Sequence, residues 1–452
     1  MDSPVSGRPA LCTLALAIAA GACSGAPDDT LDTDRPLTAE FVEVFRVGDM
    51  DPPDWAQFGR PPSLGFDGGG NLFVLNPDVP VVAVLNRDGG LVRTQGRRGE
   101  GPGEFSGPGD IYVWRDGTVA VADRGSGSYV VFAPDGSFDR QVNMSAGNVA
   151  DYGVMAFRSG ARPHPDAIAL VARGMSNIVQ EMFRRIESPN PTIGPRGLER
   201  LTLGPTGTTA EPIVRAGEVR ALASGEEASG ATDEPRRFDP ALLFDVLPDG
   251  SVAYSDSAGY SIKLVAGDGA PIGTISRPIS PEPVTTGVET TVRDSAMANF
   301  ERLYGDPANP QGPDRAPPEY MAQMVAQMRA DIEGMQFNHE IPVVISLRAT
   351  WEGGLWVRRR REGDPWEGAV GVIDVWNPDG RYVGTLPPGD PPMPDAFGPD
   401  GLAAWVELDE LDVPTIVVGR LPPGARSVKR PANSRLHAFA SGAVGNGRST
   451  NR

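Results

Sequence analysis

The sequence has few of the residues that most often build catalytic and redox centres. Its 452 residues include two cysteines, three histidines and two lysines. A Ser-His-Asp triad needs a histidine beside a nucleophile, and a zinc centre needs several histidines or cysteines close together. The histidines present do not allow us to identify either kind of site. They are His164, His339 and His437. The sequence therefore predicts no catalytic residue and no cofactor.

Positive charge is scarce as well. Arginine and lysine total 41 against 59 acidic residues, which gives a formal net charge of −18. Nucleic-acid binding depends on clustered positive charge, so this composition excludes nucleic acid as a partner. Residues 422–452 are the exception, because they carry basic residues and no acid. We expect a disordered basic tail there.

The N-terminus lacks an apolar run long enough to span a bilayer. The run Ala10–Ala20 follows Arg8 and predicts a signal peptide over residues 1–22. The small residues that end the run stand directly before Cys23. This arrangement resembles a bacterial lipoprotein signal, which would be cut before Cys23 and acylated on its thiol. Cleavage by an ordinary signal peptidase after the small residues is the alternative.

Cysteine usage supports the lipid anchor. Cys12 leaves with the signal peptide, so Cys23 would be the sole cysteine of the mature chain. A cysteine without a disulfide partner in an oxidising compartment is expected when its thiol is modified. Residues 23–40 are rich in aspartate and predict a disordered acidic tether. We therefore predict an exported lipoprotein on a membrane of the bacterial cell envelope, or otherwise a periplasmic or secreted protein.

Glycine (56) and proline (45) are abundant, as a turn-dense β protein requires. The stretch Gly96–Gly136 contains two strands of period two, at residues 111–113 and 119–123, joined by an Asp-Gly turn. A third apolar strand follows at residues 129–132. A sheet that is apolar on both faces must be covered on both sides. We expect it to pack between neighbouring sheets.

Copies of this unit recur along the chain, near the 40–50-residue spacing of propeller repeats. The poorest copy is the third, with strands expected at residues 152–157, 167–171, 178–186 and 198–203, before a loose excursion at 206–237. The separate strand at residues 41–45 is expected to complete the last sheet and close a ring. The sequence predicts an all-β, six-bladed propeller over residues 41–421.

A helical insertion is expected between blades 4 and 5, at about residues 286–337. Its apolar residues repeat with the period of a helix. A stripe of this kind either packs on the side of the propeller or forms a lid or partner surface, for which methionine is well suited. The stripe consists of Val292, Ala296, Phe300, Leu303, Met321, Met324, Val325, Met328, Ile332 and Met335.

At GRRGEGPGEF, the strand pair DGTVAVAD and the turn FAPDG, the chain resembles NHL-like six-bladed β-propellers. Within them it is similar to the secreted or lipid-anchored bacterial group. The resemblance spans roughly residues 41–421 and implies the fold. It does not fix an activity, because propellers of this kind include lyases, lactonases, receptors and scaffolds.

The glycine-rich segment Gly96–Gly103 lacks the lysine and the following helix of a phosphate-binding loop, so we expect a crossing between two blades. Four charged side chains lie on or beside it, and they either bind an anionic or sugar ligand at a channel mouth or are solvated loop charges. These residues are Arg97, Arg98, Glu100 and Glu104.

Two strands end alike, with Asp123 followed by Tyr129 and Asp256 followed by Tyr260. The recurrence favours a structural role, in which each carboxylate accepts hydrogen bonds from turn N–H groups. Ligand or cation binding is the alternative for these four residues. The abundant aspartates also leave open a calcium-type cage of oxygen ligands.

The leading functional prediction is a non-catalytic, membrane-tethered propeller that binds a small molecule or an envelope protein. The alternative is a metal-assisted hydrolase, lactonase or lyase with an acidic site at the channel mouth. Three or more carboxylate, asparagine or histidine side chains converging there from different blades would favour the alternative.

Overall fold

The computed structural model describes eleven segments of the chain. They are residues 31–38, 41–48, 52–144, 160–165, 168–173, 196–216, 236–304, 318–364, 371–389, 391–409 and 411–422. The predicted signal peptide, Cys23 and almost all of the predicted basic tail lie outside these residues. Among the described residues, no helix is long and apolar enough to cross a membrane.

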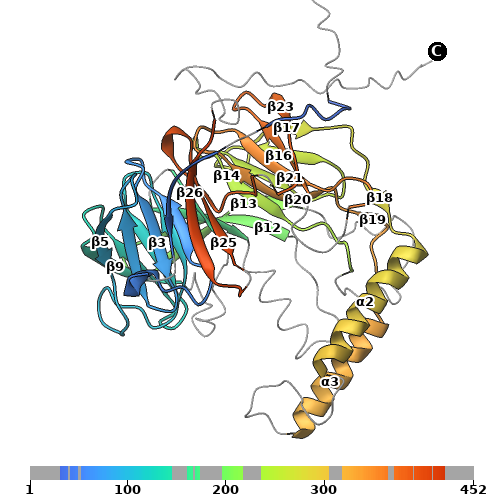
Figure 1. Ribbon diagram of the computed structural model, residues 1–452, viewed down its shortest axis with the longest axis horizontal. Coiled ribbons are helices and arrows are strands. Elements are labelled where there is room, and N and C mark those ends of the chain that lie inside the picture. Colours follow the sequence, from blue (N-terminus) through green and yellow to red (C-terminus); the bar gives the residue numbers. More distant parts are fainter. Residues whose placement is uncertain are drawn as a thin grey trace, which may run out of the picture.

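The chain forms six four-stranded antiparallel sheets arranged as the blades of a propeller (Figure 1). In five blades the strands follow one another in chain order from the innermost outward. Contacts between the innermost strands of neighbouring blades run around the centre from blade 6 through blades 1 to 4 to blade 5. The six-bladed, all-β prediction is confirmed.

Blades 1 and 2 follow the predicted pattern closely. Their strands are β2 (Ser63–Phe66), β3 (Leu72–Asn76), β4 (Val81–Leu85), β5 (Leu91–Gln95), β6 (Pro108–Val113), β7 (Val119–Asp123), β8 (Ser128–Phe132) and β9 (Phe138–Asn143). A short 3-10 helix, η1 (Asp54–Ala56), precedes them.

Blades 3 to 5 repeat the arrangement. Their strands are β10 (Arg162–His164), β11 (Ala169–Arg173), β12 (Arg196–Leu203), β13 (Thr208–Ala216), β14 (Leu243–Val246), β15 (Val252–Ser255), β16 (Ser261–Val265), β17 (Pro271–Ser276), β20 (Val344–Ala349), β21 (Leu355–Arg359), β22 (Val372–Trp376) and β23 (Tyr382–Leu386).

Blade 6 joins the two ends of the propeller. It contains β24 (Ala396–Phe397), η3 (Pro399–Gly401), β25 (Leu402–Leu408) and β26 (Pro414–Arg420). Its outer strand is β1 (Val42–Val47), which pairs antiparallel with β26 from Val42 opposite Arg420 to Val47 opposite Ile416. The prediction that the separate N-terminal strand completes the last sheet is confirmed.

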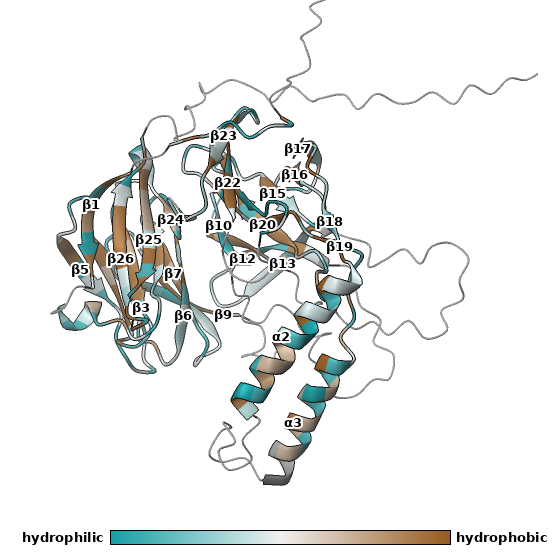
Figure 2. Ribbon diagram, turned by 45° about the vertical axis from the view of Figure 1, so that its right-hand side comes forward, coloured by the Kyte–Doolittle hydropathy of each residue, from teal (hydrophilic) through white to brown (hydrophobic). Residues whose placement is uncertain are grey.

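The blades are stable because each buries apolar side chains on both faces. All residues of β3, β7 and β8 are buried, and Figure 2 shows hydrophobic residues concentrated in the strands. Between blades 1 and 2, Phe73 and Val84 pack in one cluster with Ile111 and Val121. The Asp-Gly turn between β6 and β7 places Gly117 at φ 90°, a conformation that glycine adopts at little cost.

The insertion between blades 4 and 5 is present as predicted. It consists of β18 (Glu282–Pro283), α2 (Thr286–Tyr304), α3 (Pro318–Glu333) and β19 (Glu340–Ile341), with β18 and β19 paired. The two helices lie side by side and project away from the blades (Figures 1 and 2). Among the described side chains of the helices, Val292 and Phe300 are the ones fully buried.

Blade 3 differs from its prediction. Residues 208–216, which we expected in a loose excursion, form β13 and pair with β12. The strand predicted as the fourth of this blade is therefore its third, Arg196–Leu203. The predicted loose excursion is wrong for residues 208–216. The strand needs no apolar run of its own, because it gains its hydrogen bonds at the edge of β12. The strands expected at 152–157 and 178–186 lie outside the described residues.

The N-terminal segment also differs from its prediction. Residues 31–38 belong to the expected disordered tether, yet they dock on blade 5. The Leu37 N–H donates to Thr385 O at 2.8 Å, and the Thr385 N–H donates to Arg35 O at 2.7 Å. Asp34 pairs with two arginines of blades 4 and 5. These backbone and ionic contacts hold a segment that composition alone assigns to a tether.

Candidate functional site

The crossing between blades 1 and 2 satisfies its own charges. Arg97 Nη2 lies 2.7 Å from Glu104 Oε1, with the Arg97 side chain 80% exposed. The Gly101 N–H donates to Glu104 Oε2 at 2.9 Å. The pKa of Glu104 is lowered by that N–H first and by Arg97 second. The structure thus brings two of the four predicted loop residues together as a surface ion pair.

The side chains of the other two loop residues are not part of that ion pair. Glu100 is exposed. Arg98 donates to the backbone oxygen of Asp78 at 3.1 Å and lines a cavity of about 510 Å³ between blades 1 and 2. Phe105, fully buried, packs at the start of the second blade as the crossing requires.

Asp123 has a structural environment. Its fully buried carboxylate accepts hydrogen bonds from the Ser106 N–H at 3.0 Å, the Gly107 N–H at 2.6 Å and the Ser126 hydroxyl at 2.8 Å. Tyr129 is buried as well, with its ring centroid 6.2 Å from that of Tyr112. These contacts match the structural interpretation of the strand end.

Asp256 and Tyr260 do not repeat that arrangement. Asp256 accepts a hydrogen bond from Lys263 Nζ at 3.0 Å. The Tyr260 hydroxyl accepts one from Trp376 Nε1 at 2.8 Å, and burial raises the pKa of Tyr260. The two sequence motifs are alike, but their side chains have different partners, and the structure does not bring the two pairs into one site.

The central channel is the feature to which all six blades contribute. A cavity of about 210 Å³ is lined by the innermost strands β2, β6, β10, β14, β20 and β24. A second cavity, of about 390 Å³, lies at the ends where β10 and β14 begin and is lined from blades 3 to 6. We call this second cavity the channel mouth. Its volume is in the range of sites for small ligands.

Four arginines line the channel mouth, together with one carboxylate, that of Asp395. Three of the arginines are half-buried and Arg173 is exposed. The cluster is unusual in a chain whose net charge is −18. Planar guanidinium groups match carboxylate and phosphate oxygens in pairs. The four residues are Arg162, Arg173, Arg348 and Arg358.

Strand alternation explains how two of these arginines reach the mouth. Successive side chains of a strand point to opposite faces. In β21, Leu355 and Val357 pack in the cluster shared by blades 4 and 5, whereas Trp356 packs in the one shared by blades 5 and 6. Arg358 therefore shares the face of Trp356, and it lies opposite Ser346 of β20. Arg348, two residues after Ser346, lies on the same face of β20.

Asp245 forms an ion pair with Arg162 from the channel side. Its Oδ1 lies 3.3 Å from Arg162 Nε. The carboxylate also accepts hydrogen bonds from the Ala349 N–H and the Val246 N–H, each at 2.9 Å. Burial raises the pKa of Asp245, and the charge of Arg162 opposes that shift. Asp245 therefore forms an ion pair with one of the four arginines.

The described residues contain no group of three or more His, Cys, Asp or Glu side chains that could hold a metal ion. The four arginines of the channel mouth were not predicted from the sequence. One signal was available, since Arg358 directly follows the apolar strand residues Leu355 to Val357. A charge that continues a buried strand at its end is a candidate for the rim of a channel.

No family model and no curated protein matches the sequence. Solved structures resemble it at low identity. A DUF4221 family member from Bacteroides vulgatus shares 10% identity over 85% of this chain and 98% of its own, with a TM-score of 0.44. Virginiamycin B lyase from Staphylococcus aureus shares 10% identity over 85% of this chain and 100% of its own, with a TM-score of 0.39.

A calcium-binding regucalcin from Agrobacterium tumefaciens shares 13% identity over 86% of this chain and 96% of its own, with a TM-score of 0.36. The chain is a six-bladed β-propeller. The descriptions of these similar structures differ from one another, and none of their activities is assigned to this chain.

Proposed function

We propose that this propeller is a non-catalytic binding protein of the bacterial cell envelope that takes an anionic small molecule at the channel mouth. Cys23 would carry the lipid that tethers it, as in the secreted or lipid-anchored NHL-like group that the sequence resembles. An envelope protein that presents a carboxylate or phosphate is the related form of the same proposal.

The observation that carries the proposal is the convergence of Arg162, Arg173, Arg348 and Arg358 on one cavity. Among the residues that the structure describes, Asp395 is the one acidic residue of its lining, and Asp245 lies on the channel side. Burial lowers the pKa of Arg358, which means that its charge is incompletely solvated. A bound anion would relieve that cost, because charge-assisted hydrogen bonds replace those lost to water.

The test is calorimetric titration of the mature protein with citrate, glucuronate and phosphate, with sucrose as the neutral control. We expect at least one anion to bind, with an affinity that falls as salt is raised. The double variant Arg348→Gln, Arg358→Gln should weaken that binding by about 100-fold, since two charge-assisted contacts are lost. The matched control is Arg97→Gln, which removes an exposed arginine of the crossing loop.

Binding of an anion that the double variant leaves unchanged would place the ligand elsewhere. Mass spectrometry of the N-terminal peptide tests the tether separately. An acylated Cys23 is expected, and an unmodified N-terminus beginning at another residue would contradict the lipid anchor.

One observation favours the second candidate, a hydrolase, lactonase or lyase. Asp245 is a buried carboxyl with a raised pKa beside the channel, and such groups are candidates for general acid–base catalysis. Metal analysis of the purified protein tests the metal-assisted form. About one equivalent of a divalent cation such as calcium, lost in Asp245→Asn, would favour the enzyme over the binding protein.

A further inference from the structure

A second cluster of arginines lies at the rim between blades 4 and 5, away from the channel mouth. Asp374, fully buried on β22, accepts hydrogen bonds on Oδ2 from Arg277 Nη1 at 2.8 Å and from Arg359 Nε at 2.9 Å. Thr385 donates to the other oxygen at 2.7 Å. The guanidinium of Arg277 also lies over the ring of Tyr382, 4.4 Å from its centroid. One buried carboxylate thus serves two arginines.

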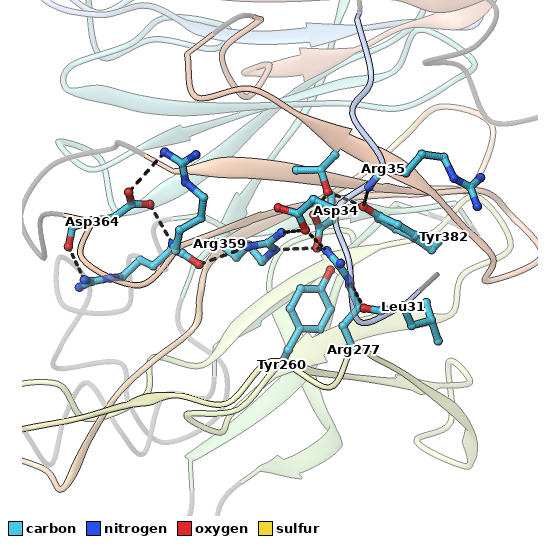
Figure 3. A network of polar contacts seen from close by, with 12 residues as sticks. Leu31, Asp34, Arg35, Tyr260, Arg277, Arg359, Asp364 and Tyr382 are labelled. Atoms are coloured by element: carbon cyan, nitrogen blue, oxygen red, sulfur yellow. Dashed lines mark hydrogen bonds and ion pairs between the residues drawn. The ribbon is translucent and has the colours of Figure 1, made fainter. Parts of the chain in front are cut away.

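The second negative charge comes from the N-terminal segment. Asp34 Oδ1 lies 3.0 Å from Arg277 Nη1 and forms an ion pair with Arg359 Nη2. Figure 3 shows Asp34 between the two arginines, with Leu31 and Tyr382 beside it. Arg277 Nε donates to Leu31 O at 3.0 Å. Asp34 is 39% exposed, whereas the two arginine side chains are almost completely buried.

Glycine at position 384 makes this docking possible. A Cβ at that position would lie 2.6 Å from Arg35 O, closer than such contacts allow. The segment therefore approaches β23 where a side chain is missing, and Pro36 forms a parallel bridge with Thr385. The segment is held by a few contacts at one edge of the blade.

Asp34 does not satisfy all of the donors around it. Among the described residues, Arg277 Nη2 and Arg360 Nε and Nη1 are buried and have no hydrogen-bond partner. Arg360 Nη2 donates to Asp364 O and lies 3.6 Å from Glu282. One cavity of about 670 Å³ is lined by four arginines and four acidic residues, which are Arg277, Arg359, Arg360, Arg361, Asp32, Asp34, Glu282 and Glu362. Buried donors without partners are costly, so a ligand that pairs them would gain affinity.

We propose that this cavity is a binding site for a phosphate group, and that Asp34 occupies it from within the chain. A carboxylate offers two oxygens, and Asp34 directs one of them to both arginines. A phosphate monoester offers three terminal oxygens and more negative charge, and it matches several guanidinium groups at once. Phosphate binding would displace Asp34 and release the N-terminal segment from β23. The proposal does not depend on the channel mouth.

The test is titration with inorganic phosphate in the Arg348→Gln, Arg358→Gln background, so that the channel mouth contributes nothing. We expect Asp34→Ala to bind phosphate about tenfold more tightly than Asp34-containing protein, because the internal competitor is removed. Gly384→Ala should also tighten phosphate binding, since it undocks the N-terminal segment without changing a charge. Asp294→Ala, at an exposed position on α2, is the matched control.

Hydrogen exchange gives an independent readout in the protein with Asp34 intact. Phosphate should accelerate exchange of the Leu37 and Thr385 amides, which are paired only while the segment is docked. Arg360→Gln should abolish both the phosphate binding and this acceleration. Equal phosphate affinity with and without Asp34, or binding that survives Arg360→Gln, would overturn the proposal.

Two sources could supply the phosphate group, and vesicles distinguish them. Binding to vesicles of phosphatidic acid, with none to phosphatidylcholine vesicles or to inorganic phosphate, would assign a lipid headgroup. Binding to inorganic phosphate would assign a soluble phosphate compound. Absence of binding in all three arms, with Asp34→Ala folded as judged by its thermal unfolding, would refute the site.

Discussion

Arg358 and Arg359 are neighbours in β21, yet they lie in different electrostatic environments. Arg358 is half-buried and faces the channel mouth, which three other arginines line. Arg359 is buried between blades 4 and 5 and is paired with Asp374 and Asp34. The strand period of two separates them, because one residue along the strand means the opposite face.

Arginine occupies two kinds of site in this propeller. At the rim, arginine is compensated by a fully buried carboxylate, which ties β17's end to β21 and β22. At the channel mouth, four arginines line one cavity, and Asp245 forms an ion pair with one of them, Arg162. A buried carboxylate that two arginines share has a structural role, whereas arginines that converge on a cavity are candidates for binding a ligand.

The largest effect should come from removing the carboxylate that both rim arginines share. Asp374→Ala leaves Arg277 and Arg359 buried around a missing charge, which we expect to lower the free energy of unfolding by about 3–5 kcal/mol. Chemical denaturation measures this loss. Asp294→Ala on α2, where the side chain is exposed, should change stability by no more than about 0.5 kcal/mol. A loss of less than about 1 kcal/mol for Asp374→Ala would show that the network contributes little.

A smaller effect should separate the two neighbouring arginines. Arg359→Gln removes two charge-assisted contacts and should cost about 2 kcal/mol of stability. Arg358→Gln relieves a half-buried charge at the channel mouth and should stay within about 1 kcal/mol of the wild type. In the calorimetric titration, Arg358→Gln should weaken anion binding more than Arg359→Gln does. Equal stability losses would mean that Arg358 is also part of a structural network.

The comparison also shows what the sequence could predict. The blades follow from local signals, namely alternating apolar residues and Asp-Gly turns such as that before Gly117. The ring closure followed from one unpaired strand. β13 was missed because it carries polar residues and Pro212 and is paired with β12 on the outer edge, where strand signals are weak.

Both arginine clusters depend on contacts between distant residues. Asp34 and Arg359 are 325 residues apart, and Leu31 and Arg277 are 246 apart. The aspartate-rich composition of the N-terminal segment predicts a tether, because composition does not reveal a buried partner elsewhere. The loop charges at Arg97 and Glu104 were conspicuous in the sequence for the opposite reason, since they are close together and satisfy each other.

The smallest effect, and the one with opposite signs in the two regions, concerns pH. Burial raises the pKa of Asp34, but the hydrogen bonds and charges of Arg359 and Arg277 outweigh it, and the pKa is lowered overall. The ionised Asp34 therefore stabilises the fold at a pH above its pKa in the unfolded chain, which is about 3.9. This stabilisation is lost as the pH falls through its lower pKa in the folded protein. The N-terminal segment should undock in acid, which hydrogen exchange at Leu37 would detect.

Asp245 should respond in the other direction. Burial raises the pKa of Asp245, so ionisation of this carboxyl opposes folding. The penalty disappears as the pH falls below the pKa that Asp245 has in the unfolded chain. Unfolding free energies from pH 2.5 to 7 should show Asp34→Asn converging on the wild type in acid. Asp245→Asn should instead gain on the wild type as the pH rises. Parallel curves for the two variants would show that the rim and channel carboxylates share one environment, and the contrast between the two clusters would not hold.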